Sequence, residues 1–251
     1  MFIHTLSILD SQTHQLRPAY STADMLDYPL SRPTLANWKS GSDVRILSIS
    51  GLSGSGTTAF SSWVLGGLLE GEEMENAITL SFKFSRSHPR ARSPFGLYLS
   101  LCRQLVSFQP HLFSEISAAA RFWTSQECFT TECLWILFRS MVMSIIEKGG
   151  CVYCLICYID HCVPSSEDTL LRMEELVKSG NGQFKLLYTQ LNDNHPAASG
   201  AGSQTSQRRC IALDNASQEI KSLKEQHIRS RIQDLVQENL SWDGLAESAL
   251  T

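Results

Sequence analysis

The stretch GLSGSGTT at residues 51–58 follows an apolar run and has nearly the form of a phosphate-binding loop, Gly-x-x-x-x-Gly-Lys-Ser/Thr. Such a loop surrounds phosphates with backbone N–H groups, while its lysine contacts the terminal phosphates and its hydroxyl residue ligates Mg²⁺. Gly51, Gly56 and Thr58 stand at the expected positions, but Thr57 replaces the lysine. A charged hydrogen bond contributes roughly 1.5–3 kcal/mol, so we expect phosphate binding to be about 10- to 100-fold weaker than with the lysine.

A phosphate-binding loop requires a strand before it and a helix after it. Residues 44–50 form a short apolar run that ends in glycine, and residues 57–69 carry apolar residues at helical spacing. Further strands are predicted at 77–85, 152–159, 184–190 and 210–213, and further helices at 94–107, 131–147, 167–178 and 216–240. This alternation predicts an α/β fold, namely a three-layer, doubly wound, mainly parallel five-stranded sheet of the P-loop NTPase type.

Length and composition indicate one globular domain with short extensions. The chain has 251 residues, and we expect a lead-in at 1–43, the P-loop domain at 44–240 with a mobile Gly/Ser-rich loop at 192–207, and a tail at 241–251. The net charge of −4 gives no electrostatic reason to expect nucleic acid or an anionic membrane as partner. No apolar run reaches the length of about 18 residues that a membrane helix needs. Eight cysteines without a signal peptide indicate reduced thiols and a cytoplasmic location.

Several segments occur in a characteristic order along residues 28–240. They are RILSISG before the loop, ITLSFKFSRSHPRARSPFGLYLSLCRQLVSFQPHLF at 78–113, LWILFRSMV, FKLLYTQ and CIALDNASQEIKSLKEQHI. This series resembles the NACHT-type signalling NTPase domain of fungal NOD-like receptor proteins, in the branch called nephrocystin-type N-terminal domains. The resemblance implies a nucleotide-binding domain that in relatives continues into a winged-helix segment and repeats.

The sequence departs from the family pattern at the positions that hydrolysis needs. When the acidic strand motif of the family is laid on LICYIDHC, the metal-binding Asp falls on Cys157 and the water-orienting Glu on His161. The sensor arginine position holds Gln190, and only Asp160 keeps a carboxylate. Phosphoryl transfer depends on positioning and charge neutralisation around the γ-phosphate, so these replacements predict loss of catalysis. We interpret Asp160 as a surface carboxylate at a strand end and His161 as a loop histidine.

The predicted function is that of a degenerate NACHT-like domain, a noncatalytic regulatory or protein-interaction module with weak or lost binding of ATP or GTP with Mg²⁺. The candidate nucleotide-contacting residues are Gly51, Gly54, Ser55, Gly56, Thr57, Thr58 and, weakly, Asp160. No catalytic or metal-binding residue is assigned, and the expected partner is a protein. One alternative is a functional ATP- or GTP-binding switch with slow hydrolysis. Another is a phosphosulfate binder, because SGTT also occurs in the phosphosulfate loop of sulfotransferases.

Two further motifs are interpreted as structural. Cys151, Cys154 and Cys157 have a spacing that metal and iron–sulfur sites use, but alternation along a strand points Cys154 away from the other two. We therefore expect them to be packing residues rather than ligands. The basic cluster SRSHPRARS at 85–93 is interpreted as a solvated loop that follows a strand.

Overall fold

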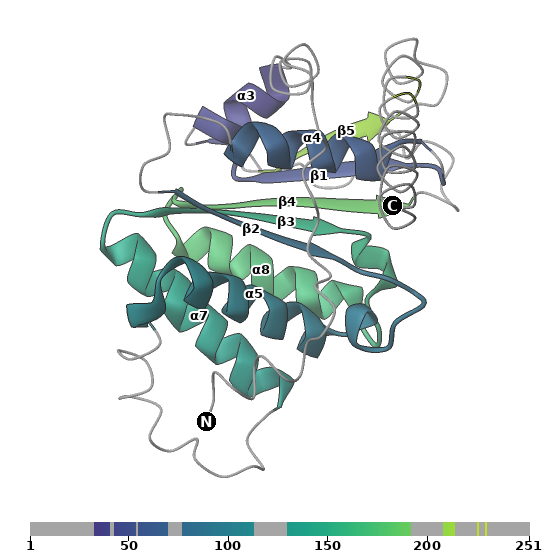
Figure 1. The fold of residues 1–251 in the computed structure, drawn as a ribbon. Coiled ribbons are helices and arrows are strands. Elements are labelled where there is room, and N and C mark those ends of the chain that lie inside the picture. The colour runs from purple at the N-terminus through teal and green to yellow at the C-terminus, as the bar shows by residue number, and fades with distance from the viewer. Residues whose placement is uncertain are drawn as a thin grey trace, which may run out of the picture.

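One parallel sheet forms the centre of the molecule (Figure 1). The computed structural model describes residues 33–40, 43–53, 55–69, 77–112, 130–191 and 208–213, together with Glu225 and Arg229. The strands are β1 (Ile46–Gly51), β2 (Ala77–Lys83), β3 (Cys151–Cys157), β4 (Phe184–Leu191) and β5 (Arg208–Leu213). Their order across the sheet is β2-β3-β4-β1-β5, and every neighbouring pair is parallel. The predicted α/β sheet of P-loop NTPase type is confirmed.

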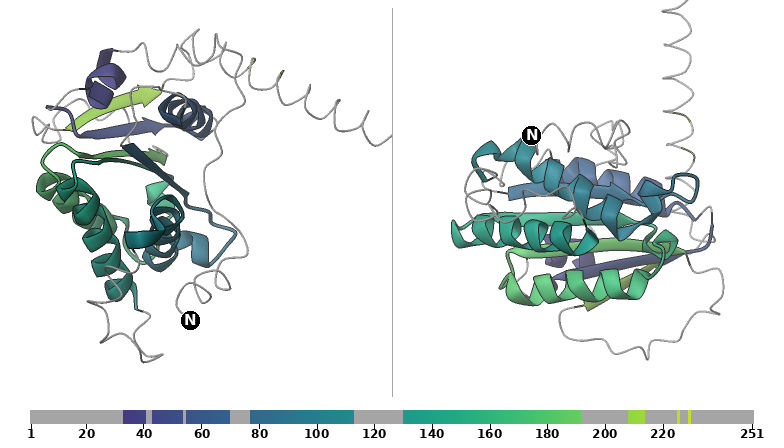
Figure 2. Two further views of the ribbon diagram at one scale, coloured as in Figure 1. Left: turned by 60° about the vertical axis from the view of Figure 1, so that its left-hand side comes forward. Right: turned by 90° about the horizontal axis from the view of Figure 1, so that it is seen from below.

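Helices cover both faces of the sheet and complete three layers (Figures 1 and 2). The first face carries α3 (Pro33–Ser40) and α4 (Thr57–Leu69), and the second carries α5 (Pro94–Phe108), α7 (Thr131–Glu147) and α8 (Ser166–Ser179). This arrangement lets each strand bury side chains on both sides, as a parallel sheet requires. Among the helices in the described part of the chain, none combines the length and apolar character needed to cross a membrane.

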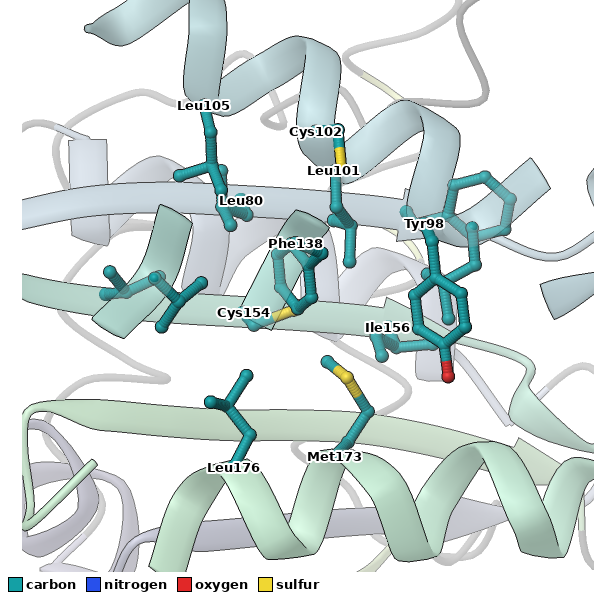
Figure 3. Packing of buried hydrophobic residues seen from close by; sticks show 14 of the residues in the cluster. Leu80, Tyr98, Leu101, Cys102, Leu105, Phe138, Cys154, Ile156, Met173 and Leu176 are labelled. Carbon is teal, nitrogen blue, oxygen red and sulfur yellow. The ribbon is translucent and has the colours of Figure 1, made fainter. Parts of the chain in front are cut away.

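Two apolar clusters pack on the two faces of the sheet. The larger lies under α5, α7 and α8, where Figure 3 shows side chains such as Leu101, Phe138 and Met173 converging on Cys154 and Ile156. The smaller lies under α3 and α4 and includes residues from the middle of β1, β3 and β4. Cys154 belongs to the first cluster and Cys157 to the second, with Cys151 packed against it. The predicted alternation of the cysteines along the strand is thus confirmed.

Most predicted elements occur within two residues of their expected bounds. The prediction of 152–159 as a strand is wrong at its end, because β3 stops at Cys157 and a short 3-10 helix, η4 (Ile159–His161), follows. Tyr158 causes this break, since its backbone adopts a left-handed conformation with φ of 58°. The mobile loop expected at 192–207 lies outside the described residues. So does the helix expected at 216–240, except for Glu225 and Arg229, which are helical.

Helix α3 is fastened to the middle of the sheet by a buried lysine. Lys185 on β4 is 5% exposed, and its ammonium donates hydrogen bonds to the carbonyls of Trp38 (2.8 Å) and Lys39 (2.5 Å) at the end of α3. The Trp38 indole N–H in turn donates to the Leu186 carbonyl at 3.2 Å. Burial lowers the pKa of Lys185, and the last carbonyls of a helix are acceptors suited to a cation. The predicted lead-in at 1–43 therefore includes a helix that packs on the domain.

The free edge of β2 is protected by a side chain from α5. Strand β2 lies at one end of the sheet, so its outer backbone groups have no strand partner among the residues that the structure describes. Gln104 supplies both missing bonds at Ser81, since its amide oxygen accepts from the Ser81 N–H at 2.9 Å and its amide nitrogen donates to the Ser81 carbonyl at 2.8 Å. Both residues are buried, so water does not replace this pair of hydrogen bonds.

Replacing Gln104 with leucine should destabilise the domain. The change keeps the apolar contacts of α5 but leaves a buried N–H and a buried carbonyl of β2 unpaired, at a cost of about 1–3 kcal/mol per group. We expect the free energy of unfolding, measured by urea denaturation, to fall by about 2–4 kcal/mol with little change in the denaturant slope. A variant with wild-type stability would show that this edge is satisfied in another way.

The cysteine thiols should differ in their reactivity toward alkylating reagents. Cys154 and Cys157 are fully buried, and burial raises the pKa of Cys157 to about 11 and that of Cys154 further. Because the thiolate is the nucleophile, iodoacetamide at pH 8 should leave both unmodified in the native protein, whereas exposed Cys210 should react. Mass spectrometry of peptides labelled before and after denaturation would measure this. Early labelling of Cys157 would contradict its place in β3.

Candidate functional site

The loop after β1 turns tightly and needs glycine where the chain packs closest. A Cβ atom added to Gly51 would lie 2.2 Å from the Ser55 Oγ and 3.2 Å from the Leu213 carbonyl oxygen, so a side chain does not fit there. The Ser55 N–H donates to the Leu52 carbonyl at 2.9 Å and closes the turn. Gly56 has φ of 91°, a conformation that favours glycine. The third candidate glycine, Gly54, lies outside the described residues.

Helix α4 begins directly at the loop and presents its N-terminal end to the site. The Phe60 N–H bonds back to the Gly56 carbonyl at 2.9 Å. The preceding N–H groups of the first turn, including those of Thr57 and Thr58, have no acceptor within the helix and can bind an anion. Thr57, which takes the lysine position, is only 3% exposed. The Ser55 hydroxyl is fully buried and has no hydrogen-bond partner among the described residues.

The hydroxyl that would ligate Mg²⁺ is engaged by a tyrosine. The Thr58 hydroxyl and the Tyr158 phenol form a hydrogen bond that connects the first turn of α4 to the residue after β3. The left-handed backbone of Tyr158 turns its side chain to this position, and its N–H donates to the Thr189 Oγ1 at 2.9 Å. Since Thr189 lies near the end of β4, this bond ties Tyr158 to the neighbouring strand. The phenol thus lies where the resemblance implies a metal ion.

The residues of η4 are held against β4 and against Tyr158. The ring of His161 stacks on that of Tyr158 with centroids 5.1 Å apart and planes 9° apart. One oxygen of Asp160 accepts from the Leu191 N–H at 3.1 Å, and the other lies 3.5 Å from the His161 Nε2. The Asp160 side chain is 27% exposed and that of His161 12%, so His161 is more enclosed than the predicted loop histidine.

Cys157 places an uncharged group where the resemblance implies a carboxylate. Burial raises its pKa to about 11, although Ser61, Lys83 and Thr189 act in the opposite direction. The thiol is therefore neutral near pH 7 and a weak ligand for a hard cation such as Mg²⁺. In the parts of the chain that the structure describes, no group of three or more His, Cys, Asp or Glu side chains is placed to hold a metal ion.

An open hollow of about 360 Å³ lies between the loop and the ends of β2 and β3. The residues that line it are Ser53, Lys83, Phe84, Ser85, Arg86, Tyr158, His161 and Leu191. Gln190 is not among the described lining residues, since alternation along β4 points it to the face opposite Thr189. The loop and the end of β3 therefore meet as the family pattern requires, but the sensor position does not join them.

None of the residues that line this hollow is among the candidate site residues of the sequence, and Arg86 falls in the segment interpreted as a solvated loop. Lys83 lies in the strand predicted at 77–85, and a charge at the end of such a strand is itself a signal for a site at the carboxyl edge of a parallel sheet. Tyr158 gave no such signal, because an aromatic residue rarely adopts a left-handed backbone. Its contact with Thr58 depends on that conformation.

Comparisons with known proteins agree with this geometry. Residues 26–190 match the family model described as nephrocystin 3, N-terminal. Comparison with curated proteins finds no match. Among solved structures, the ORC1 protein of Aeropyrum pernix in complex with DNA is similar, with a TM-score of 0.51 and 13% identity over 85% of this chain and 51% of that chain.

This chain spans about half the length of the ORC1 protein, and at such low identity the likeness shows the fold alone. The sequence match covers most of the described sheet, from a point before α3 to the end of β4. It includes the loop after β1 and the end of β3, which together form the site. The chain therefore belongs to the nephrocystin 3 N-terminal family and has the fold of a NACHT-type P-loop domain.

Proposed function

We propose that this domain is a noncatalytic descendant of P-loop NTPases that binds ATP or GTP weakly or has lost binding. In this proposal it works as a regulatory or protein-interaction module. The observation that carries the proposal is the hydrogen bond between the Thr58 hydroxyl and the Tyr158 phenol. Thr58 is the loop residue that would ligate Mg²⁺, and a metal ion must displace the phenol before it can bind there.

The charges around the site support the same proposal. A terminal phosphate carries charge that lysine, Mg²⁺ and a sensor arginine neutralise in an active P-loop enzyme. Here buried Thr57 stands at the lysine position and the neutral thiol of Cys157 at the metal-binding position. Gln190, at the sensor position, points away from the hollow. A transition state for phosphoryl transfer would therefore lack most of the groups that stabilise it.

The proposal also covers the role of the domain in the cell and the kind of partner that it binds. The resemblance to fungal NOD-like receptor proteins supports a role in signalling, in the cytoplasm, with a protein as partner. The net charge of −4 gives no support to nucleic acid or an anionic membrane as partner. The alternative of an active switch with slow hydrolysis makes the opposite prediction about turnover, so one pair of assays separates the two functions.

Nucleotide titration and a phosphate-release assay test the proposed function directly. We expect fluorescent ATP and GTP analogues to bind with dissociation constants in the high micromolar range or weaker, with little dependence on Mg²⁺. Phosphate release should not exceed that of a buffer blank. Sub-micromolar binding that requires Mg²⁺, together with turnover, would establish the active switch instead.

Introducing lysine at position 57 should improve binding without restoring hydrolysis. The Thr57→Lys variant gains a charged contact of about 1.5–3 kcal/mol, so its affinity for ATP should rise by about 10- to 100-fold, whereas Thr57→Ser as the uncharged control should leave it unchanged. Turnover should require Cys157→Asp and His161→Glu as well, because both carboxylates are missing. Phosphate release by Thr57→Lys alone would show that another group performs the chemistry.

Removing the Tyr158 hydroxyl should make nucleotide binding more dependent on Mg²⁺. Tyr158→Phe keeps the stacking on His161 but frees the Thr58 hydroxyl. Because one competing hydrogen bond is lost, the affinity for Mg·ATP should rise by about 5-fold. Tyr153→Phe is the matched control, because Tyr153 lies on β3, the strand that Tyr158 follows, and its phenol donates to the distant Lys39 carbonyl. Equal affinities for all three proteins would show that the phenol does not compete with the metal.

A further inference from the structure

We propose that the hollow beside the loop is a phosphate-binding site in which Lys83 and Arg86 supply the positive charge that the loop lacks. The ligand is a polyphosphate, either the terminal phosphates of a nucleoside triphosphate or free pyrophosphate. This inference rests on the proposed function, since it assumes that the loop after β1 still binds phosphate. It adds two side chains from the end of β2 and the segment after it, Lys83 and Arg86, as the groups that would hold the anion beside the loop.

The position of Lys83 follows from the pairing of β2 with β3. Lys83 pairs with Cys157 in the parallel register, so both side chains lie on the same face of the sheet. That face is the one covered by α4, because Cys157 packs in the cluster under α3 and α4. Lys83 therefore ends its strand on the side of the sheet where the loop and the first turn of α4 lie.

Contacts connect Lys83 to the loop across Tyr158. The Lys83 ammonium lies 5.9 Å from the centroid of the Tyr158 ring, and the hydroxyl of that ring forms a hydrogen bond with the Thr58 hydroxyl. Lys83 is also close enough to Cys157 to lower the pKa of that thiol. Lys83 and Ser53 of the loop line the same hollow, so a single anion can contact both.

The charge balance of the hollow favours an anion. Neither Lys83 nor Arg86 forms an ion pair with any described residue, although both line the hollow. Asp160 is the acidic residue of the adjoining η4, and its carboxylate already accepts from the Leu191 N–H. Ser53 and Ser85 add hydroxyl groups to the lining. Two cations with hydroxyl donors beside a helix N-terminus match the charge and the acceptors of a polyphosphate.

Calorimetric titration of the full chain with pyrophosphate and with ATP, both without Mg²⁺, tests this site. We expect Lys83→Gln to weaken the binding of both ligands by about 5- to 20-fold, and Lys83→Arg to retain most of the affinity. Lys178→Gln is the matched control, since it removes the same charge from an exposed position on α8, on the opposite face of the sheet. Similar affinities for both ligands would show that pyrophosphate alone is sufficient for binding. A clear preference for ATP would show that the site binds the phosphates of a nucleotide.

Three results would overturn the inference: no binding of either ligand by the wild type, unchanged binding by Lys83→Gln, or equal losses in Lys83→Gln and Lys178→Gln. Circular dichroism and thermal melting establish that each variant is folded. If Lys83→Gln does not fold, Arg86→Gln in the exposed loop takes its place, with an expected loss of about 3-fold. None of these results contradicts the proposed function, which fails on turnover or on tight Mg²⁺-dependent binding.

Discussion

The parallel pairing of β3 with β4 and of β4 with β1 brings the carboxyl ends of three strands from distant parts of the sequence to one edge. The loop follows β1, Tyr158 follows β3, and Thr189 lies near the end of β4, so the contacts of Tyr158 with Thr58 and Thr189 depend on this register. A slip of β3 by one residue would exchange its two faces. Cys157 would then leave the α4 side, and Tyr158 could not reach both Thr58 and Thr189.

The distribution of charge along this edge suits a bound anion better than a metal ion. The resemblance implies a lysine at Thr57 and a carboxylate at Cys157, and both positions hold uncharged side chains. The loop after β1 therefore lacks a cation, and the end of β3 lacks an anion. The positive charge that lines the hollow comes from Lys83, at the end of β2, and from Arg86 in the segment after it. In our proposals, weak phosphate binding and absent hydrolysis are therefore compatible, because hydrolysis needs the metal and binding does not.

The sequence predicted what local patterns determine. The helices predicted at 57–69 and 131–147 match α4 and α7 because local residues mark their ends. Glycine precedes α4, while Thr130 caps the start of α7 and Gly149, with φ of 84°, follows the end of α7. The end of β3 was not predicted, because tertiary bonds to Thr58 and Thr189 hold Tyr158 in a conformation that its own side chain disfavours. The roles of the candidate loop residues stay predictions that the proposed titrations test.

The hydrogen bonds from Lys185 to the end of α3 give β4 a contact at its amino end as well as the Thr189 contact at its carboxyl end. Lys185 lies near the start of β4 and Thr189 near its end, and β4 is paired with a strand on each side. One strand therefore fixes α3 at its start, through Lys185, and the Tyr158 backbone at its end, through Thr189.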